Sequence, residues 1–412
     1  MTPSVLIVGG GFAGMAAARL LDDRARVTIV SDQNFQLFSP MLAEVASGDL
    51  DPRHIITPIR QIAPRARVVS GRVEKVDVST RTVQVSRPFG LDPIELSADV
   101  LVIALGSVPA TFGIPGVEEW ALPFKSIGDA LRIRNRIIAL LESATEEPDP
   151  RLTHVAIVGA GYSGVELAGA LADFLGESSR RYFTSAPKPR VTVVDAVDRV
   201  TPALSPRLSK SAERALTRRG VDLILGQKVE AVTAAGLTLE SGRTVDAATV
   251  IWAAGVRPHP MAAEIGLSTE RGRIVVDGDL RAAPGVFVAG DVGLIPDGRG
   301  AISPPTAQFA LRQGKYLGRH LPSHLAGDKT RPFRYRNLGE LVSLGHRNAV
   351  GRVFGIPVSG FIGWFMWRTY YLMRLPGLMR KTRVSLDWSL DLLFPPDVAW
   401  LPSSDLGHDV TP

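Results

Sequence analysis

One pattern of an apolar strand, a glycine-rich turn and a helix occurs twice in this chain. The apolar run at residues 4–8 leads into the turn GGGFAG, and the run at residues 154–158 leads into the turn GAGYSG. Each helical pattern is followed by a second β-branched strand that ends beside an acid. Strand, glycine turn, helix and strand in this order are typical of a βαβ unit with parallel strands. The chain therefore contains the beginnings of two such units.

The spacing of the glycines is that of a dinucleotide-binding turn. The first glycine permits the tight turn, the second lets a pyrophosphate approach the backbone, and the third lets helix and strand pack closely. The free N–H groups at the helix N-terminus then face the phosphates. Because both copies have the strand, the helix and the distal acid, we interpret both as dinucleotide sites and not as turns without a ligand. The glycines are Gly9, Gly11 and Gly14 in the first copy and Gly159, Gly161 and Gly164 in the second.

The residues at the strand ends indicate which dinucleotides these are. Two sites in one chain favour a flavin that stays bound and a nicotinamide that exchanges, which makes the protein a flavoprotein reductase. Asp195 suits the ribose diol of NADH, and Arg199 leaves some room for the less favoured NADPH. In the first copy Ser31 occupies the usual place of the acid, and Asp32 follows it. Asp291, at the end of the run GVFVAGD, can accept a hydrogen bond from a ribityl hydroxyl or form an ordinary Asx turn.

Composition excludes several classes of protein. The 412 residues include no cysteine, so a disulfide scaffold, a cysteine-ligated metal and thiolate chemistry are ruled out. The seven histidines show no metal-like spacing, and we expect no metal. The net charge of +6 favours an anionic ligand or surface, but no nucleic-acid motif accompanies it. The sequence shows neither an export signal nor an apolar run of about 18 residues, so we expect no transmembrane helix.

The motifs resemble those of the type II NADH:quinone oxidoreductases, FAD flavoproteins with two dinucleotide-binding domains. The resemblance implies an FAD-dependent, non-proton-pumping NADH:quinone oxidoreductase of the respiratory electron-transport chain. In its ping-pong cycle NADH passes a hydride to flavin N5, and a quinone of the menaquinone or ubiquinone class then accepts two electrons. The matching segments are GGGFAGMAAARLL, NFQLFSPMLAEVASGDL, FGIPGVEEWALPFKSIGDALRIRN, VGAGYSGVELAGALAD, VIWAAGVRPHP, FVAGD and PPTAQFALRQGKYL.

The resemblance also implies roles for individual residues. Glu166 would position the nicotinamide or relay a proton, and Gln308 and Gln313 would border the quinone headgroup. The chain departs from the family at Arg312, where the first of two paired glutamines is usual, and at Leu105, where many relatives carry Thr. FAD would lie on Gly9, Gly11, Gly14, Ser31, Asp32, Gly106, Gly290, Asp291 and Ala307, and NADH on Gly159, Gly161, Gly164, Asp195 and Gly255.

Aromatic and basic side chains gather in the segment SGFIGWFMWRTYYLMRLPGLMRKTRV. The pattern is typical of an amphipathic helix in a membrane interface, with Trp and Tyr at headgroup depth and Arg toward anionic lipid. A helix buried in a core or a dimer interface shows the same pattern. The resemblance favours peripheral attachment to the cytoplasmic face of a membrane, and a homodimer is possible.

We therefore expect an α/β fold with two Rossmann-like domains and a C-terminal amphipathic membrane-associating region. The FAD-binding domain is assigned to residues 1–118 and 277–330, and the NADH-binding domain to residues 119–276. Residues 331–412 form the membrane-associating or dimerisation region and end in a loose tail of ten residues.

Two other functions stay open at this stage. Arg312 invites a specialised NAD(P)H-dependent reductase on the same scaffold, which would act on a biosynthetic quinone-like or prenylated substrate. A redox-sensing flavoprotein would bind both cofactors but turn over little. Activity on a panel of short-chain quinones would separate these functions from the first.

Overall fold

The computed structural model describes residues 2–335 and 339–400, which form two compact units. Unit 1 holds Met1–Leu37, Ile56–Val108 and Val256–Asn337, and unit 2 holds Phe38–Ile55, Pro109–Gly255 and Leu338–Pro412. The units thus divide the chain near residues 108 and 255, whereas the expected domain boundaries lie at 118 and 276. The loose tail expected for the last ten residues lies outside the described residues.

Unit 1 is built on a six-stranded sheet in the order β22-β23-β9-β1-β2-β5. Strands β23, β9, β1, β2 and β5 run parallel to one another. Strand β22 pairs antiparallel with β23 at one edge of the sheet. The central strands are apolar and fully buried, as strands covered on both faces must be. The bounds are β1 (Ser4–Val8), β2 (Arg26–Ser31), β5 (Arg67–Ser70), β9 (Val100–Ile103), β22 (Arg281–Ala283) and β23 (Val286–Val288).

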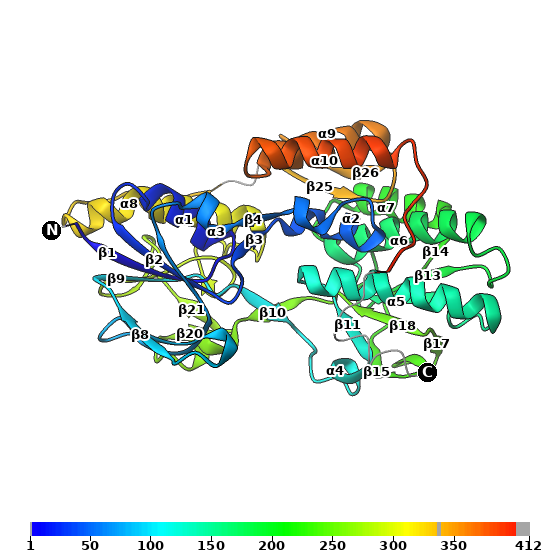
Figure 1. Cartoon of the computed structure of the whole chain (residues 1–412), viewed down its shortest axis with the longest axis horizontal. Helices are drawn as coiled ribbons and strands as arrows, with labels where there is room; N and C mark the ends of the chain where they lie inside the picture. The colour runs from blue at the N-terminus through cyan, green and yellow to red at the C-terminus, as the bar shows by residue number, and fades with distance from the viewer. Residues whose placement is uncertain (1, 336–338, 401–412) are drawn as a thin grey trace. The chain divides into compact units, whose positions relative to one another are not determined.

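Two helices of unit 1, α1 (Phe12–Leu21) and α8 (Ala307–Leu325), pack against each other (Figure 1). Their contact depends on a glycine, because a Cβ atom at Gly314 of α8 would lie 2.1 Å from the carbonyl oxygen of Ala13 in α1. The smaller elements of this unit are β3 (Phe35–Leu37), β4 (Ile56–Pro58), α3 (Ile59–Ile62), β6 (Arg72–Asp77), β7 (Thr82–Ser86), β8 (Ile94–Ser97), β19 (Val256–Pro258), β20 (Thr269–Glu270), β21 (Arg273–Val275) and β24 (Gly293–Leu294), with β10 (Ser107–Pro109) at its border.

Unit 2 contains a five-stranded parallel sheet in the order β11-β18-β12-β13-β14. Helices precede and follow the central strand β12 in the chain, and a capping box of Ser126 and Asp129 begins α5. The bounds are β11 (Ala121–Pro123), α5 (Ile127–Glu146), β12 (His154–Val158), α6 (Tyr162–Arg181), β13 (Arg190–Asp195), α7 (Pro206–Arg218), β14 (Val221–Leu225), β15 (Val229–Thr233), β16 (Gly236–Leu239), β17 (Thr244–Asp246) and β18 (Thr249–Trp252), with α2 (Leu42–Ser47) and α4 (Val117–Trp120) as short helices. The predicted α/β class with two Rossmann-like sheets is confirmed.

The C-terminal part of unit 2 is a three-stranded antiparallel meander followed by two helices (Figure 1, orange and red). The strands are β25 (Gly339–Ser343), β26 (Ala349–Val353) and β27 (Ile356–Ser359), and the helices are α9 (Gly360–Arg374) and α10 (Leu378–Asp391). The amphipathic segment, which predicted one helix, is interrupted between these two. Pro376 lacks an N–H group and Gly377 has a left-handed φ of 84°, so the helix cannot continue through them.

The aromatic residues of α9 and α10 do not lie on one face. Trp364, Trp367 and Trp388 are buried within unit 2, whereas Phe361 and Phe365 are exposed. One of the basic residues expected to face lipid, Arg368, is also buried, because its guanidinium packs between two tryptophan rings. Within the described ranges, no helix has the length and apolar character that a membrane span requires.

Substitutions at two glycines of α6 test how far the stability of unit 2 depends on the close approach of this helix to strand β12. A Cβ atom at Gly164 would lie 1.9 Å from the carbonyl oxygen of Gly159, whereas one at Gly176 would meet nothing within 4 Å. Gly164→Ala should lower the stability of unit 2 by about 2 kcal/mol or more through overpacking. Gly176→Ala, the matched control on the same helix, should raise it by about 0.5–1 kcal/mol through helix propensity. Thermal unfolding followed by circular dichroism measures both, and an equal effect of the two substitutions would contradict the packing argument.

Candidate functional site

The two glycine turns have the same backbone geometry. The N–H of Gly9 donates to the carbonyl of Val30 at 2.8 Å, and the N–H of Gly159 donates to the carbonyl of Val194 at 2.8 Å. In each unit the third glycine lies against the first, with 2.0 Å between the Cβ position of Gly14 and the Gly9 oxygen. Each turn therefore brings the start of a helix directly to the carboxyl end of the central strand.

The middle glycine of each turn leaves room for a ligand. Gly11 and Gly161 are the N-cap residues of α1 and α6, and neither helix has a side-chain cap. A Cβ atom on either glycine would meet nothing within 4 Å. The first N–H groups of each helix and the positive end of its dipole thus face open space, which is the arrangement that binds a phosphate. Both turns fit the pyrophosphate of a dinucleotide.

The strand ends beside the turns also correspond. Because Val30 and Val194 accept the equivalent hydrogen bonds, Ser31 is the counterpart of Asp195. Each side chain accepts from the backbone N–H two residues further on, at 3.3 Å for Ser31 and 2.8 Å for Asp195. The second oxygen of Asp195 accepts from the N–H of Ala160 in the glycine turn at 2.5 Å. A carboxylate has further lone pairs, so Asp195 can hold the turn and still accept from a ribose hydroxyl. Asp32 lies one residue beyond this position.

In unit 1 the carboxyl end of β23 joins the site formed by α1. Gly290 has a left-handed φ of 82°, and its Cβ position is 3.5 Å from the side chain of Ala13 in α1. Asp291 follows, and its Oδ2 accepts from the hydroxyl of Ser107 at 2.6 Å. Gly106 has an open Cβ position and a left-handed φ of 70°. The structure thus brings together the first glycine turn and the Gly-Asp turn, which are far apart in the sequence.

The residues of α8 that were expected to border a quinone differ in their surroundings. Gln313 is buried, and its Oε1 accepts from the N–H of Gly290 at 2.8 Å. Ala307 and Gln308 form the first turn of the helix, after the N-cap Thr306. Gln313 therefore fixes the Gly-Asp turn with its amide oxygen, and Gln308 stays the candidate for a headgroup contact.

Arg312, at which the chain departs from the expected glutamine pair, has a physical explanation. Its guanidinium lies over the ring of Tyr335, 5.2 Å from the centroid, and Phe309 packs edge-on against the same ring. A glutamine cannot make this cation–π contact. Arg312 thus contributes to the packing of α8 against the segment that carries Tyr335, within unit 1.

In unit 2, Glu166 lies in the first turns of α6, just after the glycine turn. Its Oε1 accepts from the N–H of Ser343 at 3.1 Å and from the indole N–H of Trp367 at 3.2 Å. Loss of hydration raises the pKa of its carboxyl to about 8, and the two donors only partly oppose this shift. Glu166 therefore carries a proton at neutral pH. Gly255, with a left-handed φ of 128°, has only the ring of Phe112 near its Cβ position, at 3.7 Å.

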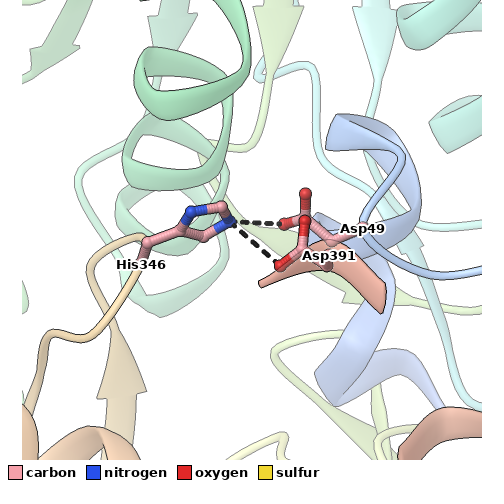
Figure 2. A group of neighbouring side chains, drawn as sticks. All are labelled: Asp49, His346 and Asp391. Atoms are coloured by element: carbon pink, nitrogen blue, oxygen red, sulfur yellow. Dashed lines mark ion pairs between the residues drawn. The ribbon is translucent and has the colours of Figure 1, made fainter. Parts of the chain in front are cut away.

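A second group of ionisable residues in unit 2 carries no sequence signal. His346 Nε2 lies 3.7 Å from Asp49 Oδ2 and 3.4 Å from Asp391 Oδ2 (Figure 2). The three residues come from the loop after α2, the β25–β26 turn and the end of α10, and Arg368 lies 3.9 Å from Asp391. Buried Glu44 of α2 accepts from the indole N–H of Trp388 at 3.2 Å. Only the tertiary structure brings these residues together, since nothing in their spacing along the chain connects them.

Comparisons with known proteins agree with this geometry. The model of the pyridine nucleotide-disulphide oxidoreductase family matches residues 3–314. The chain is 31% identical to the type II NADH:quinone oxidoreductase Ndh of Mycobacterium tuberculosis, over 94% of this chain and 88% of that protein. It is 30% identical to the type II NADH:quinone oxidoreductase of Staphylococcus aureus, over 88% of this chain and 92% of that protein. The chain belongs to the type II NADH:quinone oxidoreductase family.

The fold is also similar to that of solved structures. The structure of NDH2 from Plasmodium falciparum in complex with NADH superposes with a TM-score of 0.90 at 18% identity, over 97% of this chain and all of that one. A persulfide reductase from A. fulgidus is more distant, with a TM-score of 0.67. Because the present chain has no cysteine, the disulphide chemistry in the name of the broader family has no residue on which to act here.

The raised pKa of Glu166 predicts how stability depends on pH. The folded chain holds this proton up to about pH 8, whereas an unfolded glutamate releases it near its ordinary pKa of 4.5. The proton on Glu166 therefore contributes fully to the stability of the folded chain below pH 4.5, and this contribution is lost as the pH rises toward 8. Glu166→Gln stays neutral, so its unfolding free energy should exceed that of the wild type by about 2 kcal/mol or more at high pH and little at pH 5. Urea unfolding at both pH values measures the difference, and Glu177→Gln on the same helix serves as control. A difference that does not change with pH would show that Glu166 is ionised in the folded chain.

Proposed function

We propose that this chain is an FAD-dependent NADH:quinone oxidoreductase, with FAD on the glycine turn of unit 1 and NADH on that of unit 2. The single observation that carries this is the pair of equivalent turns, each with an uncapped helix N-terminus and an open middle glycine, in a chain of this family. When bound, the flavin accepts a hydride and passes on two electrons. The protein's part is to hold both dinucleotides, exclude water and supply a proton.

Residues of unit 1 would hold FAD through contacts with its polar parts. The α1 N–H groups bind the pyrophosphate, and Gly11 lets it approach the backbone. Asp291 keeps one oxygen on Ser107 and can accept from a ribityl hydroxyl with the other. The buried amide of Gln313 holds Gly290 and thereby fixes Asp291, so this residue acts by positioning the turn.

Residues of unit 2 would hold NADH in the same way. The N–H groups of α6 bind its pyrophosphate, and Asp195 accepts from the adenosine ribose. NADH is favoured over NADPH because a 2′-phosphate would meet this carboxylate. Arg199 donates to the carbonyl of Pro202 at 2.8 Å, which directs its guanidinium to the protein's own backbone. Glu166 carries the proton that a reduced quinone needs, and Gln308 would border its headgroup.

A variant pair tests both cofactor assignments. Gly161→Ala places a methyl group where the NADH pyrophosphate would approach and should raise the Kd for NADH about tenfold or more, with flavin content unchanged. Gly11→Ala should instead lower the flavin content of the purified protein. Both variants should fold, because nothing lies within 4 Å of either added methyl. Flavin absorbance and NADH titration measure the effects, and exchange of the two phenotypes would reverse the assignment of the units.

The reaction itself is tested by anaerobic stopped-flow. NADH should bleach the flavin of the purified protein, and menadione or a ubiquinone analogue should then restore its absorbance much faster than oxygen does. Bleaching followed by slow reoxidation with every quinone would contradict quinone reduction and favour a different acceptor. The same panel decides between the menaquinone and ubiquinone classes.

We further propose that α9 and α10 attach the protein to the surface of an anionic membrane, on its cytoplasmic side. Their exposed apolar side chains are Phe361, Ile362, Phe365, Met373, Leu378, Met379, Leu386 and Leu390. Arg374 and Arg383 are exposed on the same two helices. Apolar side chains of this kind enter the acyl boundary, and the guanidinium groups meet the anionic headgroups.

Vesicle sedimentation tests this attachment. The double variant Phe361→Ser/Phe365→Ser should bind vesicles of phosphatidylglycerol about tenfold more weakly than the wild type, because each lost ring removes apolar area from the bilayer. Phe89→Ser in unit 1 is the matched control, since Phe89 is 98% exposed but lies outside these helices. Equal binding of the double variant and wild type would contradict the proposal. If the wild type does not bind vesicles but dimerises through this face of α9 and α10, the face belongs to an interface with a second copy of the chain.

A further inference from the structure

The proposed reaction consumes one proton from water in each turnover. NADH supplies two electrons and one proton as a hydride, whereas a quinone needs two electrons and two protons to become a quinol. The balance is NADH + H⁺ + quinone → NAD⁺ + quinol. A nicotinamide or quinone that covers the exposed part of Glu166 also closes that side to water. The proton must then reach Glu166 from the interior of unit 2.

The interior of unit 2 contains a cavity at this position. It measures about 10 Å³, which is room for about one water molecule. Glu166 and Glu44 both line it, together with Asp49, His346, Arg368 and the ring of Trp367. A single water could therefore bridge the two glutamates. Each is also held by a tryptophan, Glu166 by Trp367 and Glu44 by Trp388.

The charges around the cavity leave protons on the two glutamates. Protonated His346 faces the carboxylates of Asp49 and Asp391, Arg368 faces Asp391, and the buried Arg134 guanidinium lies near Asp49. Arg368 is the cation that acts on Glu44, and it is shared with Asp391 and Asp49, so an ionised Glu44 would be buried without a partner of its own, which is costly. Burial accordingly raises the pKa of Glu44 to about 8, although the Arg368 guanidinium and Trp388 oppose the shift. Asp49 and Asp391 act on Glu44 in the same direction as burial.

The other end of the group opens to solvent. The side chain of His346 is 38% exposed, compared with 10% for Asp49 and 11% for Asp391. Figure 2 shows the imidazole between the β25–β26 turn and both carboxylates, with Asp49 beside α2, the helix that carries Glu44. Asp49 and Asp391 raise the pKa of His346 to about 9, so it carries a proton at neutral pH. Four other charged groups lie near this end. Asp173 accepts from the backbone N–H of His346, and Arg219 pairs with Asp173. Glu177 acts on Asp391, and Arg134 acts on Asp49.

We propose that protons for quinone reduction reach Glu166 along a route through unit 2, from His346 and its two aspartates to Glu44 and across the water-sized cavity. This inference rests on the proposed function and names the side chains that supply its proton. Glu44 gives its proton to Glu166 through the cavity and regains one from the His346 group. Every member either holds a proton or accepts one, and adjacent members line the same cavity or form an ion pair.

Glu44→Gln is the decisive variant. The amide keeps the size of the side chain and can still accept from Trp388, but it cannot release a proton. Stopped-flow with NADH should bleach the flavin at a rate within twofold of wild type, because hydride donation needs no proton from the protein. Reoxidation by menadione at about pH 8, and the proton uptake that a pH-indicator dye reports, should both slow about tenfold or more. Formate, a small weak acid, should restore part of the rate.

Two controls separate this route from a structural role. Glu142→Gln makes the same chemical change on an exposed residue of α5, outside the cavity, and should behave as wild type. The infrared band of a protonated carboxylic acid should be weaker in Glu44→Gln than in wild type at neutral pH, whether or not the enzyme turns over. If Glu44→Gln does not fold, His346→Gln tests the same route at its partly exposed end and should show the same selective loss.

The outcomes distinguish the inference from the proposed function. Slow reoxidation of the wild type by all quinones would contradict the function and the inference with it. Fast wild-type reoxidation, with Glu44→Gln and His346→Gln within twofold of it from about pH 6 to 9, would overturn the inference alone. Equal slowing of bleaching and reoxidation would assign Glu44 to the packing of α2 instead of to proton transfer.

Discussion

The close approach of a helix to the end of a strand, made possible by a glycine, is the constraint on which this structure depends. In both units the third glycine of the turn lies against the carbonyl of the first, at a distance that no Cβ atom allows. This contact brings the helix N-terminus to the carboxyl edge of the sheet, and it leaves the middle glycine facing open space. Packing and ligand binding thus use different glycines of one turn. A substitution can therefore damage either property without damaging the other.

A second constraint acts inside unit 2, where carboxyl groups outnumber cations. Asp49 and Asp391 face His346, with Arg368 beside Asp391 and Arg134 near Asp49, and Arg368 is further held between two tryptophan rings. Glu44 shares Arg368 with these aspartates, and burial keeps protons on both Glu44 and Glu166. Such groups are poised for proton transfer at neutral pH, because their pKa lies close to it. The same burial that weakens the fold at high pH thus prepares the carboxyls for chemistry.

The sequence predicts the parts of the fold that are local. Buried strands, glycine turns and their helices have short-range patterns, and the two Rossmann-like sheets follow from them. The group around Glu44 has no such pattern, because its residues come from α2, the β25–β26 turn, α9 and α10. The amphipathic segment shows a different limit. Its aromatic pattern indicates an apolar face but not its partner, and the structure buries Trp364 and Trp367 while exposing Phe361 and Phe365.

Helix α9 connects the two proposals made for unit 2. On one side Trp367 donates to Glu166, and Arg368 lines the cavity and faces Asp391. On the other side Phe361 and Phe365 are exposed and available to lipid. A rotation or shift of α9 on a membrane would therefore change the hydrogen bond to Glu166 and the position of the nearest buried cation. Under the two proposals, attachment to a bilayer and proton supply to the quinone would therefore both involve this fifteen-residue helix, with the Trp367 hydrogen bond as their link.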